Sequence, residues 1–140
     1  MTKDLYYTIP EYFLARMNEH DQVVSVTDVS TNEFFLFRID RSRYESLTVW
    51  LSDAYSFGDM DYVNRPAELK RGDYILIAKP EGGGGASQHL IDAAGIGVGK
   101  LGELMGALRT RDMWTYVAPT WEEKMERKKR WNTRALFGRK

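Results

Sequence analysis

Two neighbouring segments rich in β-branched and aromatic residues constrain the fold of this chain more than any other feature. Their sequences are QVVSVTDV at 22–29 and EFFLFRID at 33–40, and only Ser30, Thr31 and Asn32 lie between them. Val, Ile, Thr and Phe favour extended backbone, whereas Ser and Asn favour turns. Because so short a connection joins only antiparallel strands, these residues predict a β-hairpin.

Helices are predicted on both sides of this hairpin. A Ser or Thr followed three residues later by Glu is the capping-box pattern of a helix N-terminus. This pattern begins three expected helices, at Thr8 for residues 8–20, at Ser42 up to about residue 55, and at Thr120 for the end of the chain. Periodic apolar residues predict two more helices, over 88–94 and 100–109.

Further strands complete the predicted fold. Short apolar runs predict strands over 74–77 and 113–118, and residues 57–66 are expected to form a loop. This order of elements is typical of an α+β protein. We expect a small, mainly antiparallel sheet of about four strands, covered by helices on one face, with a basic C-terminal helix. We assign residues 1–119 to one globular domain and 120–140 to that helix, as part of the same domain or projecting from it.

The segment 82–106 is a glycine-rich insertion, in which nine of 25 residues are glycine. Four of them are consecutive, at 82–85. Each glycine loses much conformational entropy when its backbone is ordered, and it offers no side chain for packing. The sequence therefore predicts a mobile loop at 82–85.

The run AAGIGVGKLG at 93–102 raises the hypothesis of an anion site at Gly97, Gly99 and Lys100. Backbone N–H groups of a glycine turn before a helix bind phosphate, and a lysine neutralises its charge. A P-loop, however, would need Gly in place of Ala94 and Ser or Thr in place of Leu101. We expect these glycines to serve close packing or a hinge, and keep nucleotide binding, or an enzyme that uses 95–100, as an alternative.

Composition narrows the chemistry further. The chain has no Cys and only two His, and its acidic residues lack calcium-loop spacing, so neither a metal site nor a cofactor is expected. The first residues lack the apolar core of a signal peptide, and no apolar run is long enough to cross a membrane. We expect a cytoplasmic protein without membrane contact.

The charge distribution is uneven although the net charge is zero. Residues 121–140 hold eight Lys and Arg against three Glu, a net charge of +5, which the first 120 residues balance with −5. At 100° per residue, Trp131 lies roughly 80° around the helix from Trp121, so both rings cannot share one buried stripe. We expect Trp121 and Met125 to pack on the body. The expected partner-binding residues are Trp121, Arg127, Lys128, Arg130, Trp131 and Arg134.

These features favour a non-enzymatic interaction protein that binds and regulates or inhibits a larger partner. Its expected partner is an acidic protein surface or a nucleoprotein machine. In size and charge layout the chain resembles the compact phage proteins that bind host machinery, and this resemblance implies a partner of that kind, such as RNA polymerase. Direct nucleic-acid binding by the same helix is the alternative, against which the acidic body argues. Assembly into a homo-oligomer stays open.

Overall fold

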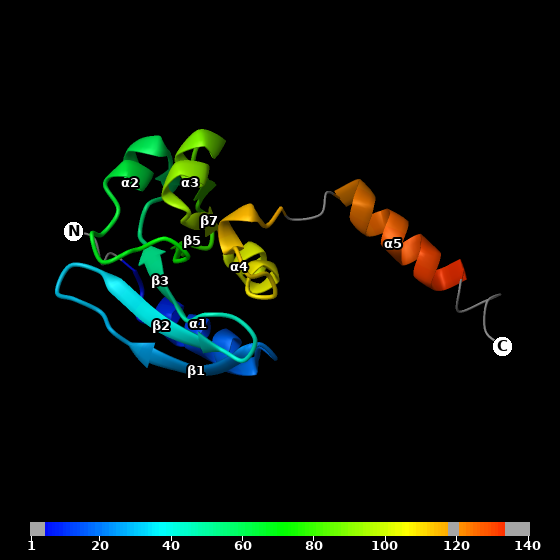
Figure 1. Ribbon diagram of the computed structural model, residues 1–140, viewed down its shortest axis with the longest axis horizontal. Coiled ribbons are helices and arrows are strands. Elements are labelled where there is room, and N and C mark those ends of the chain that lie inside the picture. The colour runs from blue at the N-terminus through cyan, green and yellow to red at the C-terminus, as the bar shows by residue number, and fades with distance from the viewer. Residues whose placement is uncertain (1–4, 118–120, 134–140) are drawn as a thin grey trace.

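The architecture is taken from a computed structural model, which describes residues 5–117 and 121–133 (Figure 1). Its helices are α1 (Thr8–Glu19), α2 (Asp59–Val63), α3 (Gln88–Ala94), α4 (Leu101–Ala107), the 3-10 helix η1 (Met113–Thr115) and α5 (Trp121–Thr133). Its strands are β1 (Val23–Asp28), β2 (Phe35–Arg41), β3 (Leu47–Ser52), β4 (Ser56–Phe57), β5 (Tyr74–Ile77), β6 (Gly83–Gly84) and β7 (Gly97–Gly99). The α+β class, the hairpin and the helix at the start of the chain are confirmed.

Five strands form the main sheet, in the order β1-β2-β3-β5-β7. The first three are antiparallel neighbours, whereas β5 is parallel both to β3 and to β7. Strands β4 and β6 form a separate parallel pair. The sheet therefore has one strand more than the four expected, and its antiparallel arrangement holds only as far as β3.

Helices cover both faces of this sheet, which corrects the expectation of one covered face. Alternate residues of a strand point to opposite faces. Val49 and Leu51 of β3 face α1 and α4, while Trp50 faces α2 and α3. Both sets are buried, as are all four residues of β5. Two apolar faces need two layers of cover, so the molecule has a helix–sheet–helix arrangement around β3 and β5.

The helix predicted from Ser42 to about residue 55 is wrong, because this stretch forms strand β3. Its apolar residues fit a helical spacing at Leu47 and Leu51, but Leu47, Val49 and Leu51 also alternate with period two. Pairing with β2, in which Val49 lies opposite Phe37, decides between the two patterns. Burial of both strand faces stabilises this choice, which no local propensity reveals.

Two further predictions are corrected near the sheet edges. Where a strand is expected at 113–118, residues 113–115 form the 3-10 helix η1, which packs beside β7 and buries Met113, and residue 118 lies outside the described residues. The loop expected at 57–66 contains helix α2, whose first turn is capped by Asp61, since its carboxylate accepts from the Gly58 N–H at 2.9 Å. In both cases a helix of only three or five residues is too short to leave an apolar period in the sequence.

Gly83 and Gly84 form strand β6 within the segment 82–85, for which the sequence predicts a loop. Gly83 N–H donates to the Tyr55 carbonyl and Gly85 N–H to the Phe57 carbonyl, both at 3.1 Å. Gly84 has a φ of +109°, and a Cβ there would collide with the Phe57 carbonyl oxygen. This close backbone approach explains a glycine at 84 in structural terms.

Candidate functional site

Helix α5 carries most of the partner-binding residues predicted from the sequence. Its described side chains, at 122–126, 128 and 129, are all exposed, and Met125 is 44% exposed. Met125 therefore does not pack on the body as expected. In Figure 1 the helix lies apart from the sheet and its covering helices. The side chains of Trp121, Arg127, Arg130 and Trp131, and all of Arg134, lie outside the described part of the structure.

Charges along α5 follow the direction of the helix dipole. Glu122 and Glu123 occupy the first turn, where the partial charge of the backbone is positive. The basic run at 127–130 follows in the second half, nearer to the negative end. The same order that stabilises the helix thus gathers its positive charge at one end. Such an end attracts acidic surfaces in a salt-dependent way.

Gly97 and Gly99, the expected anion-binding glycines, lie within strand β7 and beneath the ring of Tyr74. A Cβ at Gly97 would come within 2.6 Å of two Tyr74 ring carbons, and a Cβ at Gly99 within 2.6 Å of its hydroxyl oxygen. The N–H of Gly97 donates to the Asp73 carbonyl. Both positions therefore have a packing reason to be glycine.

Lys100 follows directly, as the residue before helix α4. Its ammonium group donates to the Pro80 carbonyl at 2.8 Å. Strands β5 and β7 are parallel, with Leu76 opposite Gly99, so their C-terminal ends lie side by side. This register places Lys79, two residues after β5, and Lys100, one residue after β7, at one site.

These two lysines line a groove between α1 and the end of β5. The groove has a volume of about 410 Å³. Its walls come from the N-terminal half of α1, from the end of β5 and from the start of α4, and its lining residues are Thr8, Ile9, Tyr12, Phe13, Leu76, Ile77, Ala78, Lys79, Pro80, Lys100 and Leu101. Ligand sites of parallel sheets lie at this same end of the strands.

A second hollow continues the groove and shares Ile9, Lys79 and Pro80 with it. Exposed tyrosines surround the two hollows: Tyr6 and Tyr55 line the second, and Tyr12 lines the first. The Tyr55 hydroxyl donates to the Glu81 carboxylate at 2.5 Å, and this bond raises the pKa of the tyrosine. The first hollow therefore offers apolar walls, an aromatic rim and two ammonium groups, and the second adds the Glu81 carboxylate.

The groove does not follow from the sequence. The glycine run points to Lys100, but strand β7 has no apolar alternation from which its pairing with β5 could be predicted. The available signal was the pair of lysines that follow the apolar run 74–78 and the glycines 97–99. Only the parallel register of β5 and β7 shows that these two lysines lie close together.

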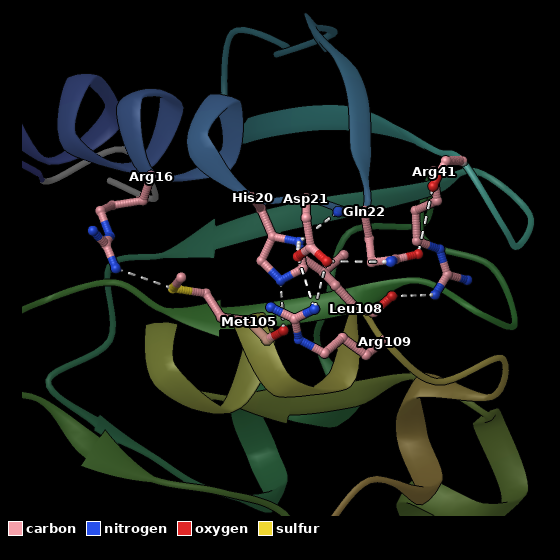
Figure 2. A network of polar contacts seen from close by, with 9 residues as sticks. Arg16, His20, Asp21, Gln22, Arg41, Met105, Leu108 and Arg109 are labelled. Atoms are coloured by element: carbon pink, nitrogen blue, oxygen red, sulfur yellow. Dashed lines mark hydrogen bonds and ion pairs between the residues drawn. The ribbon is translucent and has the colours of Figure 1, made fainter.

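His20 belongs to a polar network that ties the sheet to α4 (Figure 2). Its Nε2 lies 2.8 Å from the Met105 carbonyl, and its Nδ1 accepts from the Gln22 N–H at 3.1 Å. These two contacts are satisfied when the ring carries a proton on Nε2, which donates to the Met105 carbonyl. Beside it, Arg109 pairs with the Asp21 carboxylate at 2.7 Å. Both ring nitrogens of His20 thus make bonds to backbone, which gives this residue a structural role.

Within residues 5–117 and 121–133, no group of three or more His, Asp or Glu side chains is placed to hold a metal ion. No helix in the described ranges is long and apolar enough to cross a membrane. The chain matches no protein-family model, and neither a curated protein nor a solved structure matches it.

Proposed function

We propose that this chain is a non-enzymatic interaction protein that binds an acidic partner through helix α5 and thereby regulates or inhibits it. The observation behind the proposal is the run of four basic residues at 127–130, on a helix whose described side chains are all exposed. Because none of these side chains is buried against the rest of the protein, helix α5 contributes little to the stability of the fold. Its uniform charge is then available for a partner.

The charge pattern also favours a class of partner. An acidic protein surface, as on a nucleoprotein machine such as RNA polymerase, attracts the +5 end of the chain and is repelled by the −5 remainder. The contact would therefore be confined to α5 and would orient the protein on its partner. Such partners work in the cytoplasm, where the proposal places the protein.

Direct nucleic-acid binding is the second candidate, because the same four residues could contact phosphates. The acidic body weakens this candidate, since nucleic-acid-binding domains are usually basic as a whole. The two candidates differ in the target that they require, which makes them separable in one experiment.

The experiment measures binding of the full chain to purified bacterial RNA polymerase and, separately, to a single-stranded DNA oligonucleotide. We expect binding to the polymerase that weakens as salt rises and that nuclease treatment leaves intact. Reversing the charges at 127–130 to Glu should weaken it by at least about a hundredfold, because like charges then face each other. Lys70→Glu, which reverses one charge on an exposed lysine of the body, is the control for charge reversal outside α5 and should be compared with Lys128→Glu alone.

Other outcomes decide against the proposal. Binding to the oligonucleotide alone would establish the nucleic-acid candidate. Binding that the charge-reversed variant retains would remove α5 from the interaction altogether. Deletion of residues 131–140 adds a check on folding: the thermal transition should stay unchanged while binding is lost, and a collapse of the fold would show that this end of α5 is part of the core.

A further inference from the structure

The groove beside α1 has the size and lining of a small-molecule site. Its volume of about 410 Å³ falls within the range of ligand pockets, and apolar side chains from α1, β5 and α4 form most of its walls. Ile9, Leu76 and Leu101 are among them. Water in contact with such walls is released when an apolar group replaces it, so the groove favours an apolar ligand.

Charge sets the second requirement on the ligand. The charged residues among those that line the 410 Å³ hollow are Lys79 and Lys100, while the Glu81 carboxylate, which accepts from the Tyr55 hydroxyl, lines the adjoining second hollow. The Lys100 ammonium donates to the Pro80 carbonyl and keeps two further N–H groups. Two ammonium groups beside apolar walls complement an anion that is attached to an apolar body.

We infer that this groove is a binding site for a small amphipathic carboxylate, a molecule with an apolar chain or ring and one carboxyl group. The apolar part occupies the hollow between α1 and the end of β5. Its carboxylate lies at the C-terminal ends of β5 and β7, beside the ammonium groups of Lys79 and Lys100. The site shares no residue with α5, so the inference does not depend on the proposed function.

A nucleotide fits the same place less well. Phosphate groups are bound by rows of free backbone N–H groups. Here the strand β7 pairs with β5, and the Gly97 N–H already donates to the Asp73 carbonyl. The groove thus supplies point charges from lysine and apolar contact, which suit a carboxylate on an apolar body.

Decanoate is a suitable probe, with decan-1-ol and decyltrimethylammonium as comparisons of equal chain length. Calorimetry below the micellar concentration gives the affinities, and amide NMR shifts locate the site. We expect decanoate to bind more tightly than both comparisons and to shift the amides of Ile9, Ala78 and Leu101. The doubly substituted Lys79→Met, Lys100→Met variant should bind decanoate at least about tenfold more weakly, because charged hydrogen bonds are lost.

Controls separate loss of the site from loss of the fold. Lys100→Arg keeps the charge and should retain most of the affinity, and Lys128→Met in α5 should change nothing. Ala78→Phe fills the hollow and should abolish binding with an unchanged circular dichroism spectrum. Equal binding of decanoate and decan-1-ol would overturn the role of the lysines. Amide shifts away from the groove, or the absence of binding by any probe, would overturn the site.

Discussion

The two halves of the sheet are built in different ways. In the antiparallel half, β1 to β3, large side chains fill the space between strands and helices, as where the rings of Phe13 and Phe37 lie 5.3 Å apart. In the parallel half, β5 and β7, the absence of side chains makes room, since Gly97 and Gly99 accommodate the ring of Tyr74. Packing around β2 therefore depends on large side chains, whereas packing of β7 against the Tyr74 ring depends on glycines. Loss of volume should destabilise the first region, and gain of volume should destabilise the second.

The largest effect is expected where volume is removed from the antiparallel half. Phe37 is 1% exposed, and Phe37→Ala should lower the free energy of unfolding by about 3–5 kcal/mol, since it leaves a cavity beside Phe13. Val24→Ala in β1 is the control, because Val24 is 67% exposed and its loss should cost less than about 0.5 kcal/mol. Urea denaturation measures both values. Similar losses for the two variants would contradict a tightly packed half.

A second test concerns the contact between α1, which packs beside β1, and α4, which packs beside β5 and β7. His20 connects the end of α1 with the Met105 carbonyl of α4, and its ring is buried (Figure 2). His20→Phe keeps a ring in place but leaves the Met105 carbonyl and the Gln22 N–H without this partner. We expect a loss of roughly 2–4 kcal/mol in the free energy of unfolding. An exposed histidine provides the control, since His89→Phe should be nearly neutral. If both were neutral, water would be satisfying these groups.

The parallel half is tested by adding volume. Gly97→Ala should cost about 1–3 kcal/mol of stability, because the new methyl group meets the buried Tyr74 ring. A Cβ added at Gly102 in helix α4 would have no atom within 4 Å apart from those of its chain neighbours and the helix backbone. Gly102→Ala should therefore stabilise the protein by about 0.5–1 kcal/mol. In a Tyr74→Leu background the cost of Gly97→Ala should fall, and a double-mutant cycle measures this coupling. Additive effects would mean that the ring and the glycine do not depend on each other.

The same contrast explains what the sequence could predict of the fold. The hairpin of β1 and β2 could be predicted because its strands are adjacent in sequence and carry their own turn. Strand β3 could not, since Leu47 and Leu51 satisfy a helical spacing as well as an alternating one, and only pairing with β2 distinguishes the two. Strand β7 is made of glycines around Val98, so its extended form depends on β5, which is distant in sequence and supplies the Tyr74 ring.

The two candidate sites differ in the same way: one consists of contiguous residues, and the other depends on pairing between distant segments. The charge of α5 is a property of contiguous residues, so the basic surface could be predicted, and its function stays a prediction. The groove depends on the register of β5 against β7, which brings Lys79 and Lys100 together across twenty residues of intervening chain. Sequence patterns describe local structure well, but they do not contain the distances between segments that pair in parallel.

The smallest effect is expected from pH, and it too differs between the halves. In the antiparallel half, hydroxyl donors Ser46 and Ser25 hold the pKa of Asp40 below its ordinary value of 3.8. In the parallel half, burial raises the pKa of Asp73 above 3.8, although the Lys70 and Thr48 N–H groups oppose this rise. Asp40 thus adds stability above pH 3.8 that is lost as the pH falls through its folded-state pKa, whereas the contribution of Asp73 is lost as the pH rises through its own.

Carbon NMR of the two carboxyl groups between pH 2 and 7 measures this difference directly. We expect Asp40 to titrate first as the pH is raised from 2, and Asp73 later. Ser46→Ala should move the Asp40 pKa toward 3.8 and leave that of Asp73 in place, because Ser46 donates only to Asp40 in the described contacts. Ser42→Ala is the matched control, since the Ser42 hydroxyl donates to the Gln22 amide oxygen, which does not titrate in this range. If Asp73 titrated before Asp40, burial would not govern its ionisation, and the two N–H donors at its carboxylate would outweigh the loss of solvent.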